Sequence, residues 1–249
     1  MKISIIIPAR MSSSRLPEKP LADILGQSLI MRVYRQALIS KLAHETIIAT
    51  DHPLIFDHVT QHGGRVMLTS KDHLSGTDRI AEVAARLDTD IIINLQGDEP
   101  LINPEQIDEL IQAMISREIV IGTQCVRIKN HTELFDYSVV KIVRDYCDKV
   151  LFFSRQAIPA CRDLPYRNWF EKATYFKHVG IYGFRKDILL KITKLPQSEY
   201  EKSESLEQLR WMQNGFPIYG FETEYNSIGV DTAEDLEKVR EIVLREMMH

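Results

Sequence analysis

The stretch that decides the fold begins at the third residue and reads ISIIIPARMSSSRLPEKPLADILG (residues 3–26). Its first five residues are dominated by isoleucine, which is typical of a strand buried on both faces. Pro8 ends this run, and the apolar pattern resumes only at Leu21. The segment between them is stiffened by further prolines, and it carries three cations, which are Arg10, Arg15 and Lys19. A core strand is therefore followed at once by a positively charged loop.

Strands and helices alternate along the first 95 residues. Short apolar runs predict strands at residues 3–7, 46–49, 65–68 and 91–95. Helical periodicity lies between them, at residues 30–40, 54–62 and 77–87. This alternation predicts an α/β fold with a parallel sheet covered by helices on both faces. Because ligands of such sheets bind at the carboxyl ends of the strands, we expect the charged loop to lie at the binding edge.

The pattern changes after a helix predicted at residues 104–117. The segments IGTQCVRI, SVVKIVRD and KVLFFSR predict strands too closely spaced for intervening helices. Residues 160–175 predict an irregular loop, 176–185 a strand, 187–193 a helix, 203–215 a helix, 216–224 and 226–230 strands, and 232–248 a terminal helix. No linker or internal repeat interrupts the chain. We therefore expect residues 1–249 to form one domain, with a mainly parallel central sheet and a smaller mixed-sheet lobe.

Composition narrows the class of protein. The charged fraction is 27%, the hydrophobic fraction 44% and the net charge −4, as in an ordinary globular protein. This acidic balance gives no support to nucleic-acid binding. No run is long enough for membrane insertion and no signal-peptide layout is present, so we expect a cytoplasmic protein. The three widely spaced cysteines indicate reduced thiols rather than a disulfide framework or a zinc site.

Two acids follow predicted strands. Asp98, in IIINLQGDEPLI, comes three residues after Leu95, and Asp231, in SIGVDTAEDLEKVR, follows Val230 directly. Taken alone, Asp98 is equally explained as a turn residue, and Asp231 is better explained as a helix cap. Two strand-end acids in a sheet that also carries a cationic loop favour another interpretation. A polyphosphate with bound Mg²⁺ is commonly held by few carboxylates and several cations.

A further loop, HLSGTDR, covers residues 73–79 and enters a predicted helix. Ser75 and Gly76 would let the backbone approach a ligand. Asp78 or Thr77 would cap the helix, and its free amides would point to the same edge. Taken alone, the loop is better explained as an ordinary capped helix start.

Seven segments, taken together and in order, carry a resemblance over nearly the whole chain. They are IIPARMSSSRLPEKPLADI, HLSGTDRIAEVA, NLQGDEPLI, FFSRQAIP, HVGIYGFR, LEQLR and GVDTAEDLEKVR. The chain resembles the 3-deoxy-manno-octulosonate (Kdo) cytidylyltransferases. The resemblance implies a glycosyltransferase-A-like nucleotidyltransferase fold and, as partner, a second copy in a homodimer. It also implies a reaction in which CTP and Kdo give CMP-Kdo and pyrophosphate with Mg²⁺ as cofactor, for lipopolysaccharide biosynthesis.

The resemblance also implies roles for individual residues. Residues 1–120 would form the nucleotide-binding half, and residues 121–225 the sugar-binding and dimerisation half, with the terminal helix returning to the first. The residues expected to act in catalysis are Arg10, Lys19, Asp98 and Asp231, of which the two acids would hold Mg²⁺. The nucleotide would be bound by Pro8, Ala9, Arg10, Lys19, His73, Ser75, Gly76, Arg79 and Asp98. The sugar would be bound by Arg15, Gln96, Arg155, His178, Tyr182, Glu207 and Gln208.

The sugar side also follows from chemistry. A sugar acid needs an Arg for its carboxylate and mixed donors and acceptors for its hydroxyls. Singly, Arg155 is as well explained as a surface charge and His178 as a half-buried histidine. No nucleophile stands out, so we expect direct in-line attack by the sugar hydroxyl on the α-phosphorus of CTP, without a covalent intermediate.

Two departures from the family pattern leave alternatives open. Glu18 replaces a glycine that is common after RLP, and Gln156 and Ala157 replace Ala-Pro in SRAPIP. The second departure leaves 8-amino-Kdo, or another sugar acid such as sialic acid, as an alternative substrate. A nucleotide sensor without catalytic activity on the same fold is the non-enzymatic alternative.

Overall fold

The structure, a computed structural model, describes residues 1–11, 15–226 and 228–248. Its main strands are β1 (Ile3–Ala9), β4 (Glu45–Thr50), β5 (Val66–Leu68), β6 (Ile91–Asn94), β7 (Ile121–Arg127), β8 (Lys141–Arg144), β9 (Val150–Ser154), β10 (Phe176–Arg185) and β11 (Tyr219–Glu222). They form one sheet with the order β11-β7-β10-β6-β1-β4-β5, to which β8 is attached through β10 and β9 through β8. Strands β6, β1, β4 and β5 are parallel, whereas β10 runs antiparallel to both β6 and β7. The predicted α/β fold is confirmed.

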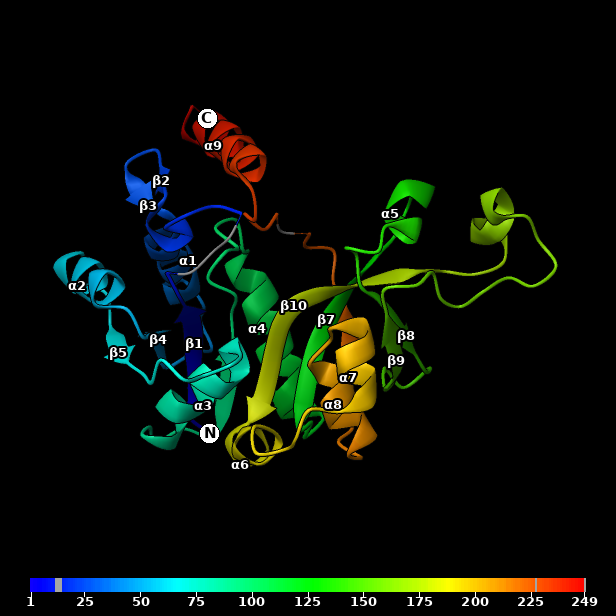
Figure 1. Cartoon of the computed structure of the whole chain (residues 1–249), viewed down its shortest axis with the longest axis horizontal. Coiled ribbons are helices and arrows are strands. Elements are labelled where there is room, and N and C mark those ends of the chain that lie inside the picture. Colours follow the sequence, from blue (N-terminus) through cyan, green and yellow to red (C-terminus); the bar gives the residue numbers. More distant parts are fainter. Residues whose placement is uncertain (12–14, 227, 249) are drawn as a thin grey trace.

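Helices cover both faces of this sheet (Figure 1). The helices are α1 (Leu29–Leu38), α2 (Pro53–Gln61), α3 (Gly76–Ala85), α4 (Pro104–Ser116), α5 (His131–Phe135), α6 (Lys186–Ile192), α7 (Glu199–Glu204), α8 (Gln208–Gln213) and α9 (Ala233–Met247). Short 3₁₀ helices, η1 (Lys19–Leu21) and η2 (Tyr166–Glu171), and a small hairpin of β2 (Asp23–Ile24) and β3 (Gln27–Ser28) complete the fold. None of the helices in the described ranges is long and apolar enough to span a bilayer.

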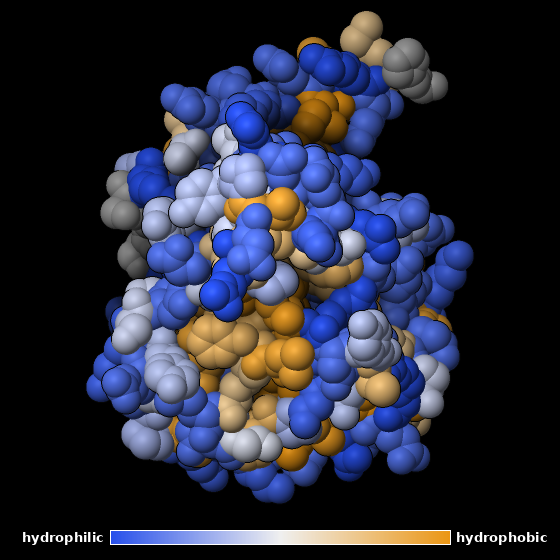
Figure 2. Space-filling view, turned by 90° about the vertical axis from the view of Figure 1, so that its right-hand side faces the viewer, coloured by the Kyte–Doolittle hydropathy of each residue, from blue (hydrophilic) through white to orange (hydrophobic). Residues whose placement is uncertain are grey.

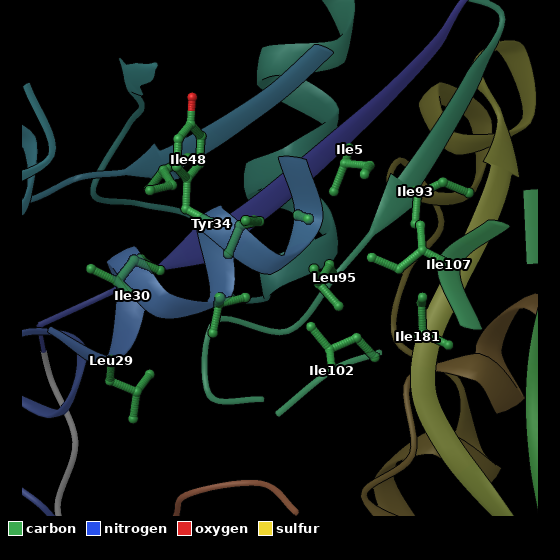
Figure 3. Packing of buried hydrophobic residues seen from close by; sticks show 14 of the residues in the cluster. Ile5, Leu29, Ile30, Tyr34, Ile48, Ile93, Leu95, Ile102, Ile107 and Ile181 are labelled. Carbon is green, nitrogen blue, oxygen red and sulfur yellow. The ribbon is translucent and has the colours of Figure 1, made fainter. Parts of the chain in front are cut away.

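The isoleucines of β1 divide the core into two layers. Ile5 packs with residues of α1, α4 and α9, while Ile6 packs with residues of α3, α6 and α8 on the other face. Successive side chains of a strand point to opposite faces, so an unbroken apolar run is what a doubly covered strand requires. Figure 3 shows the first layer, in which Ile5 and Ile93 of neighbouring strands lie near Ile107 of α4.

Three expectations fail in the second half of the chain. No strand is assigned to residues 226 and 228–230, and residue 227 lies outside the described residues. The helix predicted at 203–215 is divided into α7 and α8, because Ser205 adopts a left-handed backbone with φ 52°. The loop predicted at 160–175 contains η2, which contributes Trp169 to a small separate core.

The terminal helix packs against elements from the first half of the chain. Val239 and Val243 of α9 belong to the core layer built on α1, and Arg240 donates to the carbonyl of Asp23 from Nε at 2.9 Å. Figure 1 shows α9 above the hairpin β2–β3, while α5 and η2 extend from the opposite side. The binding edge of the sheet is thus reached by segments from both ends of the chain.

Candidate active site

A cavity of about 800 Å³ opens at the carboxyl ends of β1 and β6. Its lining comes from the loop after β1, the start of α3, the loop after β6 and the segment before α9. The sequence-predicted residues that line it are Pro8, Ala9, Arg10, Arg15, Lys19, His73, Ser75, Gly76, Arg79, Gln96, Asp98 and Asp231. The four loops that sequence reasoning assigned to one edge are therefore brought together.

Lys19 lies at the centre of the charged part of this cavity. Its Nζ is 2.7 Å from Oδ2 of Asp98 and 3.1 Å from Oδ1 of Asp231. Arg15 reaches the same oxygen of Asp231 at 3.1 Å. The ammonium group is shielded, with only 16% of the Lys19 side chain exposed. Two acids from distant parts of the chain thus share one cation.

Backbone contacts explain why these acids meet. A Cβ on Gly97 would lie 2.8 Å from the carbonyl oxygen of Pro8, so only glycine lets the loop after β6 approach β1 this closely. The amide of Val230 donates to the carbonyl of Asp98 at 2.8 Å, which fixes the following residue, Asp231, beside Asp98.

The carboxylate pair fits a hard divalent cation. The two side chains already converge on a single positive group, and about half of the Asp231 side chain is exposed (49%). The described residues contain no group of three or more His, Cys, Asp or Glu side chains suited to a metal. A pair of carboxylates with further oxygens from a substrate phosphate is the arrangement that Mg²⁺ commonly takes in proteins.

The start of α3 is an ordinary capped helix, as its sequence alone suggests, and it also lines the cavity. Ser75 accepts a hydrogen bond from the amide of Asp78 at 3.0 Å, and Asp78 accepts one from the amide of Ser75 at 3.2 Å. A Cβ on Gly76 would lie 3.2 Å from the ring of Pro8, so the helix start packs closely on the end of β1. Its free amides are available to an anion there.

Arg79 and His73 are fixed by neighbouring side chains. The buried guanidinium of Arg79 is 3.3 Å from Asp51 and donates to Thr69 at 2.5 Å. The Nε2 of His73 lies 2.6 Å from Glu82. Burial alone would raise the pKa of Glu82, but hydrogen bonds from the Ser70 amide and from His73 lower it overall. Both cavity residues are therefore held in place before any ligand arrives.

Five predicted sugar-side residues do not line this cavity. They are Arg155, His178, Tyr182, Glu207 and Gln208. Glu207 is nevertheless linked to it, since its carboxylate accepts hydrogen bonds from Ser75 at 2.9 Å and from Thr77 at 2.6 Å. Burial raises the pKa of Glu207, and these two hydrogen bonds oppose the rise. The Glu207 carboxylate therefore joins α8 to the start of α3.

The sequence predicts Thr77, with Asp78, only as a possible helix cap and not as a site residue. The cap is Ser75 instead. Thr77 lies inside the SGTDR segment and is buried, so its hydroxyl is directed to Glu207 rather than to solvent. The only signal in the sequence is its place between Gly76 and Asp78, and that signal does not reveal a partner 130 residues away.

Arg155 is held by backbone carbonyls. Its guanidinium donates to the carbonyls of Glu204 at 2.7 Å, Tyr137 at 3.0 Å and Ser205 at 3.4 Å. Its own amide donates to the Glu204 carboxylate at 2.8 Å. This places the guanidinium between the loop before β8 and the end of α7, where an added anion would meet an already oriented fork of donors.

His178 and Tyr182 lie together on β10. Their ring centroids are 5.1 Å apart, and the ring centroid of Phe153 lies 5.2 Å from that of His178. Burial lowers the pKa of His178 to about 3, so the imidazole is neutral at physiological pH. The hydroxyl of Tyr182 is buried and has no hydrogen-bond partner among the described residues.

Comparisons with known proteins identify the family of this chain. Residues 4–238 match the family model described as Cytidylyltransferase. A 3-deoxy-manno-octulosonate cytidylyltransferase of Geotalea uraniireducens (strain Rf4) is 45% identical over 97% of this chain and 98% of that relative. The chain belongs to the 3-deoxy-manno-octulosonate cytidylyltransferase family. A member from Escherichia coli is 44% identical, covering 99% of this chain and 98% of its own.

Solved structures of cytidylyltransferases have the same fold as this chain. A CMP:2-keto-3-deoxy-manno-octonic acid synthetase complexed with CTP superposes with a TM-score of 0.93 at 44% identity, over 99% of this chain and 100% of that one. A cytidylyltransferase from Leptospira borgpetersenii, at 20% identity and a TM-score of 0.66, shares the fold, covering 98% of this chain and 87% of that one. This family member thus has the predicted nucleotidyltransferase fold.

Proposed function

We propose that the protein transfers CMP from CTP to Kdo, giving CMP-Kdo and pyrophosphate for lipopolysaccharide assembly. One observation carries the proposal. A single cavity at the carboxyl ends of β1 and β6 brings together Arg10, Arg15 and Lys19 with the paired carboxylates of Asp98 and Asp231. This is the charge pattern that a nucleoside triphosphate with a bound divalent cation requires.

Lys19 and Arg10 would bind the triphosphate. In the free protein Lys19 is paired with both acids, so CTP must draw its ammonium toward the phosphate oxygens. Arg10 is exposed at the cavity and offers a planar fork to the same oxygens. These two cations would stabilise the charge that develops as pyrophosphate leaves.

Asp98 and Asp231 would hold Mg²⁺ once Lys19 has turned toward the phosphates. When bound, Mg²⁺ would neutralise part of the negative charge of the triphosphate and of the departing pyrophosphate. The sugar hydroxyl attacks the α-phosphorus, the bond to the bridging oxygen breaks, and the hydroxyl proton is released. The protein contributes alignment of the two substrates and electrostatic stabilisation.

The sugar acid would lie toward β10 and α8. Arg155 supplies a cation for the sugar carboxylate, and Gln96, His178 and Glu207 supply hydrogen-bonding groups for its hydroxyls. Gln96 is oriented by a hydrogen bond of 3.2 Å from its Nε2 to the carbonyl of Gly180 on β10. In this proposal Gln96 would lie between the two substrates.

Pyrophosphate release tests the proposal. The protein should release pyrophosphate with CTP, Mg²⁺ and Kdo, and much less with UTP or with Kdo replaced by sialic acid. A third assay uses 8-amino-Kdo, because Gln156 and Ala157 depart from the family pattern and leave this sugar as an alternative substrate. Binding of CTP without release with any sugar acid would indicate a sensor, and a clear preference for another sugar acid would replace the substrate named here.

We further propose that the active form is a cytoplasmic homodimer. Figure 2 shows apolar side chains gathered in a hollow on the face that carries α5, β8, β9 and η2. Exposed apolar and aromatic side chains of this half include Phe135, Tyr137, Leu151 and Tyr166. Contiguous apolar surface of this kind favours protein association. Light scattering during size-exclusion chromatography should give twice the mass of the 28.8 kDa chain.

A further inference from the structure

Thr123 lies beneath an irregularity in β10. The register between β10 and β7 shifts between Val179 and Tyr182, where two residues of β10 have no counterpart on β7. Thr123 is fully buried on β7, and its hydroxyl oxygen contacts three groups of β10. These are the carbonyl of Ile181 at 2.7 Å, the carbonyl of Val179 at 3.2 Å and Nε2 of His178 at 2.9 Å.

These contacts decide where the protons are. A hydroxyl has one proton to donate, and a carbonyl oxygen can only accept. Two acceptor oxygens at 2.7 Å without a proton between them would repel each other, so the Thr123 proton must point to Ile181. The same hydroxyl oxygen must then accept the proton of His178 Nε2 at 2.9 Å.

The other ring nitrogen of His178 is left as an acceptor. Because burial keeps the imidazole neutral, only one nitrogen carries a proton, and the Nδ1 atom therefore presents a lone pair. The rings of Phe153 and Tyr182 both pack against this imidazole.

Two neighbouring polar groups lack partners. Tyr182 faces Asn94 across the β10–β6 pair, and both side chains are more than nine-tenths buried. The Tyr182 hydroxyl and Oδ1 of Asn94 have no hydrogen-bond partner among the described residues. Buried polar groups are normally paired, so unpaired ones on adjacent strands point to a polar ligand or bound water.

We infer that Thr123 is a positioning residue that fixes His178 as the neutral tautomer protonated on Nε2, so that Nδ1 accepts a hydrogen bond from a hydroxyl of the sugar substrate. The part concerning the substrate rests on the proposed function. The tautomer itself does not, because it follows from contacts within the chain. His178 is then a hydrogen-bond acceptor of the sugar site and not its general acid.

Nitrogen NMR of the ring tests the tautomer directly. In protein labelled with ¹⁵N-histidine, the His178 signals, assigned by their loss in His178→Gln, should show a protonated Nε2 and an unprotonated Nδ1 at neutral pH. Thr123→Ser keeps the hydroxyl and should keep this signature. Thr123→Val has a similar shape without a hydroxyl, and it should lose the single tautomer.

A wild-type signal with the proton on Nδ1, or an unchanged tautomer in Thr123→Val, would overturn the inference. If the valine variant does not fold, the wild-type and serine spectra still decide the result. This outcome does not depend on which sugar is used, so a correct tautomer with no activity toward Kdo would reject the proposed substrate and leave the role of Thr123 standing.

Kinetics then test the link to the sugar. Thr123→Val should raise the KM for the sugar by about tenfold and leave the KM for CTP unchanged, as expected for one misdirected hydrogen bond. His178→Gln can still accept through its amide oxygen and should retain more sugar use than His178→Leu. Equal sugar KM values in these two variants would contradict the acceptor role.

Discussion

The proposed site has a phosphate half and a sugar half, which hold their polar side chains in opposite ways. On the phosphate side, charges are paired with one another, as Lys19 is with Asp98 and Asp231. On the sugar side, the guanidinium of Arg155 is held by backbone carbonyls, and the Tyr182 hydroxyl is buried and lacks a partner among the described residues. One half pairs charge with charge in the free protein, and the other holds its cation with neutral backbone groups.

This difference predicts how each half responds to substrate. The phosphate half must exchange ion pairs when a charged ligand arrives, so its residues should affect turnover as well as binding. The sugar half is preorganised by fixed hydrogen bonds, so its residues should act mainly on sugar binding. Variants in the two halves should therefore separate cleanly in their effects on the two substrates.

The largest effect should come from the paired acids. Asp98→Asn and Asp231→Asn keep the size of each side chain but remove a charge that holds Lys19 and would hold Mg²⁺. We expect each variant to lose on the order of a hundredfold or more in turnover at saturating substrates. Pyrophosphate release measured over a range of Mg²⁺ concentrations checks this.

A matched control is Asp163→Asn, because the Asp163 side chain is 91% exposed and lies outside the cavity. It should keep normal turnover. Each acid variant should also keep its melting temperature, since both carboxylates are partly exposed and such ion pairs contribute little to stability. Near-normal turnover in either variant would assign that acid to a turn or a helix cap.

The next effect concerns Arg155 and tests the opposite half. Arg155→Ala should raise the KM for the sugar by about tenfold to a hundredfold, the range expected for a lost charge-assisted hydrogen bond. Calorimetric CTP binding should stay nearly unchanged. Arg155→Lys should restore sugar use only in part, because an ammonium cannot form the planar fork.

Arg162→Ala provides the control for that experiment, since Arg162 lies in the same connection between β9 and η2, with a side chain that is 95% exposed. The fold of the Arg155→Ala variant must also be checked. The Arg155 side chain joins the loop before β8 to the end of α7, so circular dichroism must show that the alanine variant retains its fold. Weaker CTP binding with unchanged sugar use would move Arg155 to the phosphate half.

The two halves also differ in how far sequence alone could predict them. The phosphate side is built from loops that follow parallel strands, and the carboxyl ends of such strands meet at one edge. Arg10, Lys19 and Asp98 were therefore predictable neighbours. The sugar side depends on long-range contacts, such as that between Thr77 and Glu207, for which neither local sequence gives a signal.

A backbone exception accounts for one of the failures in the fold. Ser205 has a left-handed backbone and divides a segment whose helical periodicity runs on without a break. A serine carries no local signal for that conformation, unlike a glycine. The isoleucines of β1, by contrast, specified a strand, its double burial and its central place in the sheet, because a doubly covered strand must be apolar on both faces.

A smaller effect is expected when Lys19 is removed from the free protein. Without its ammonium, the two carboxylates repel each other and should bind a divalent cation more readily. We expect Lys19→Met to tighten Mn²⁺ binding to substrate-free protein on the order of fivefold, which is equivalent to about 1 kcal/mol for a partly exposed ion pair. Titration followed by electron paramagnetic resonance measures it.

Lys2→Met controls for the loss of a lysine, because Lys2 pairs with Asp88 far from the cavity. Its Mn²⁺ affinity should match that of the wild type. The Lys19→Met variant should at the same time show slower turnover, since the ammonium is also needed on the triphosphate. Unchanged or weaker Mn²⁺ binding in Lys19→Met would show that the ammonium does not compete with metal for the two carboxylates.

The smallest effect concerns Glu18, at the border of the phosphate side. Glu18 adopts a left-handed backbone with φ 54° directly before η1, which explains why a glycine suits this position. A side chain in that conformation destabilises the folded protein by roughly 1–2 kcal/mol. Glycine removes this strain, but its greater freedom in the unfolded chain offsets part of the gain. Glu18→Gly should therefore be more stable than Glu18→Ala by about 1 kcal/mol.

Comparing these two variants separates the effect of the backbone conformation from the effect of removing the Glu18 charge. Both remove the same carboxylate beside the triphosphate site, so both should lower the KM for CTP by a similar small factor, most clearly at low ionic strength. Only the glycine variant also removes the strain of the left-handed backbone. The free energy of unfolding in urea measures this difference. Equal free energies of unfolding for the two variants would mean that the loop relaxes around the alanine side chain and that the left-handed backbone carries no cost here.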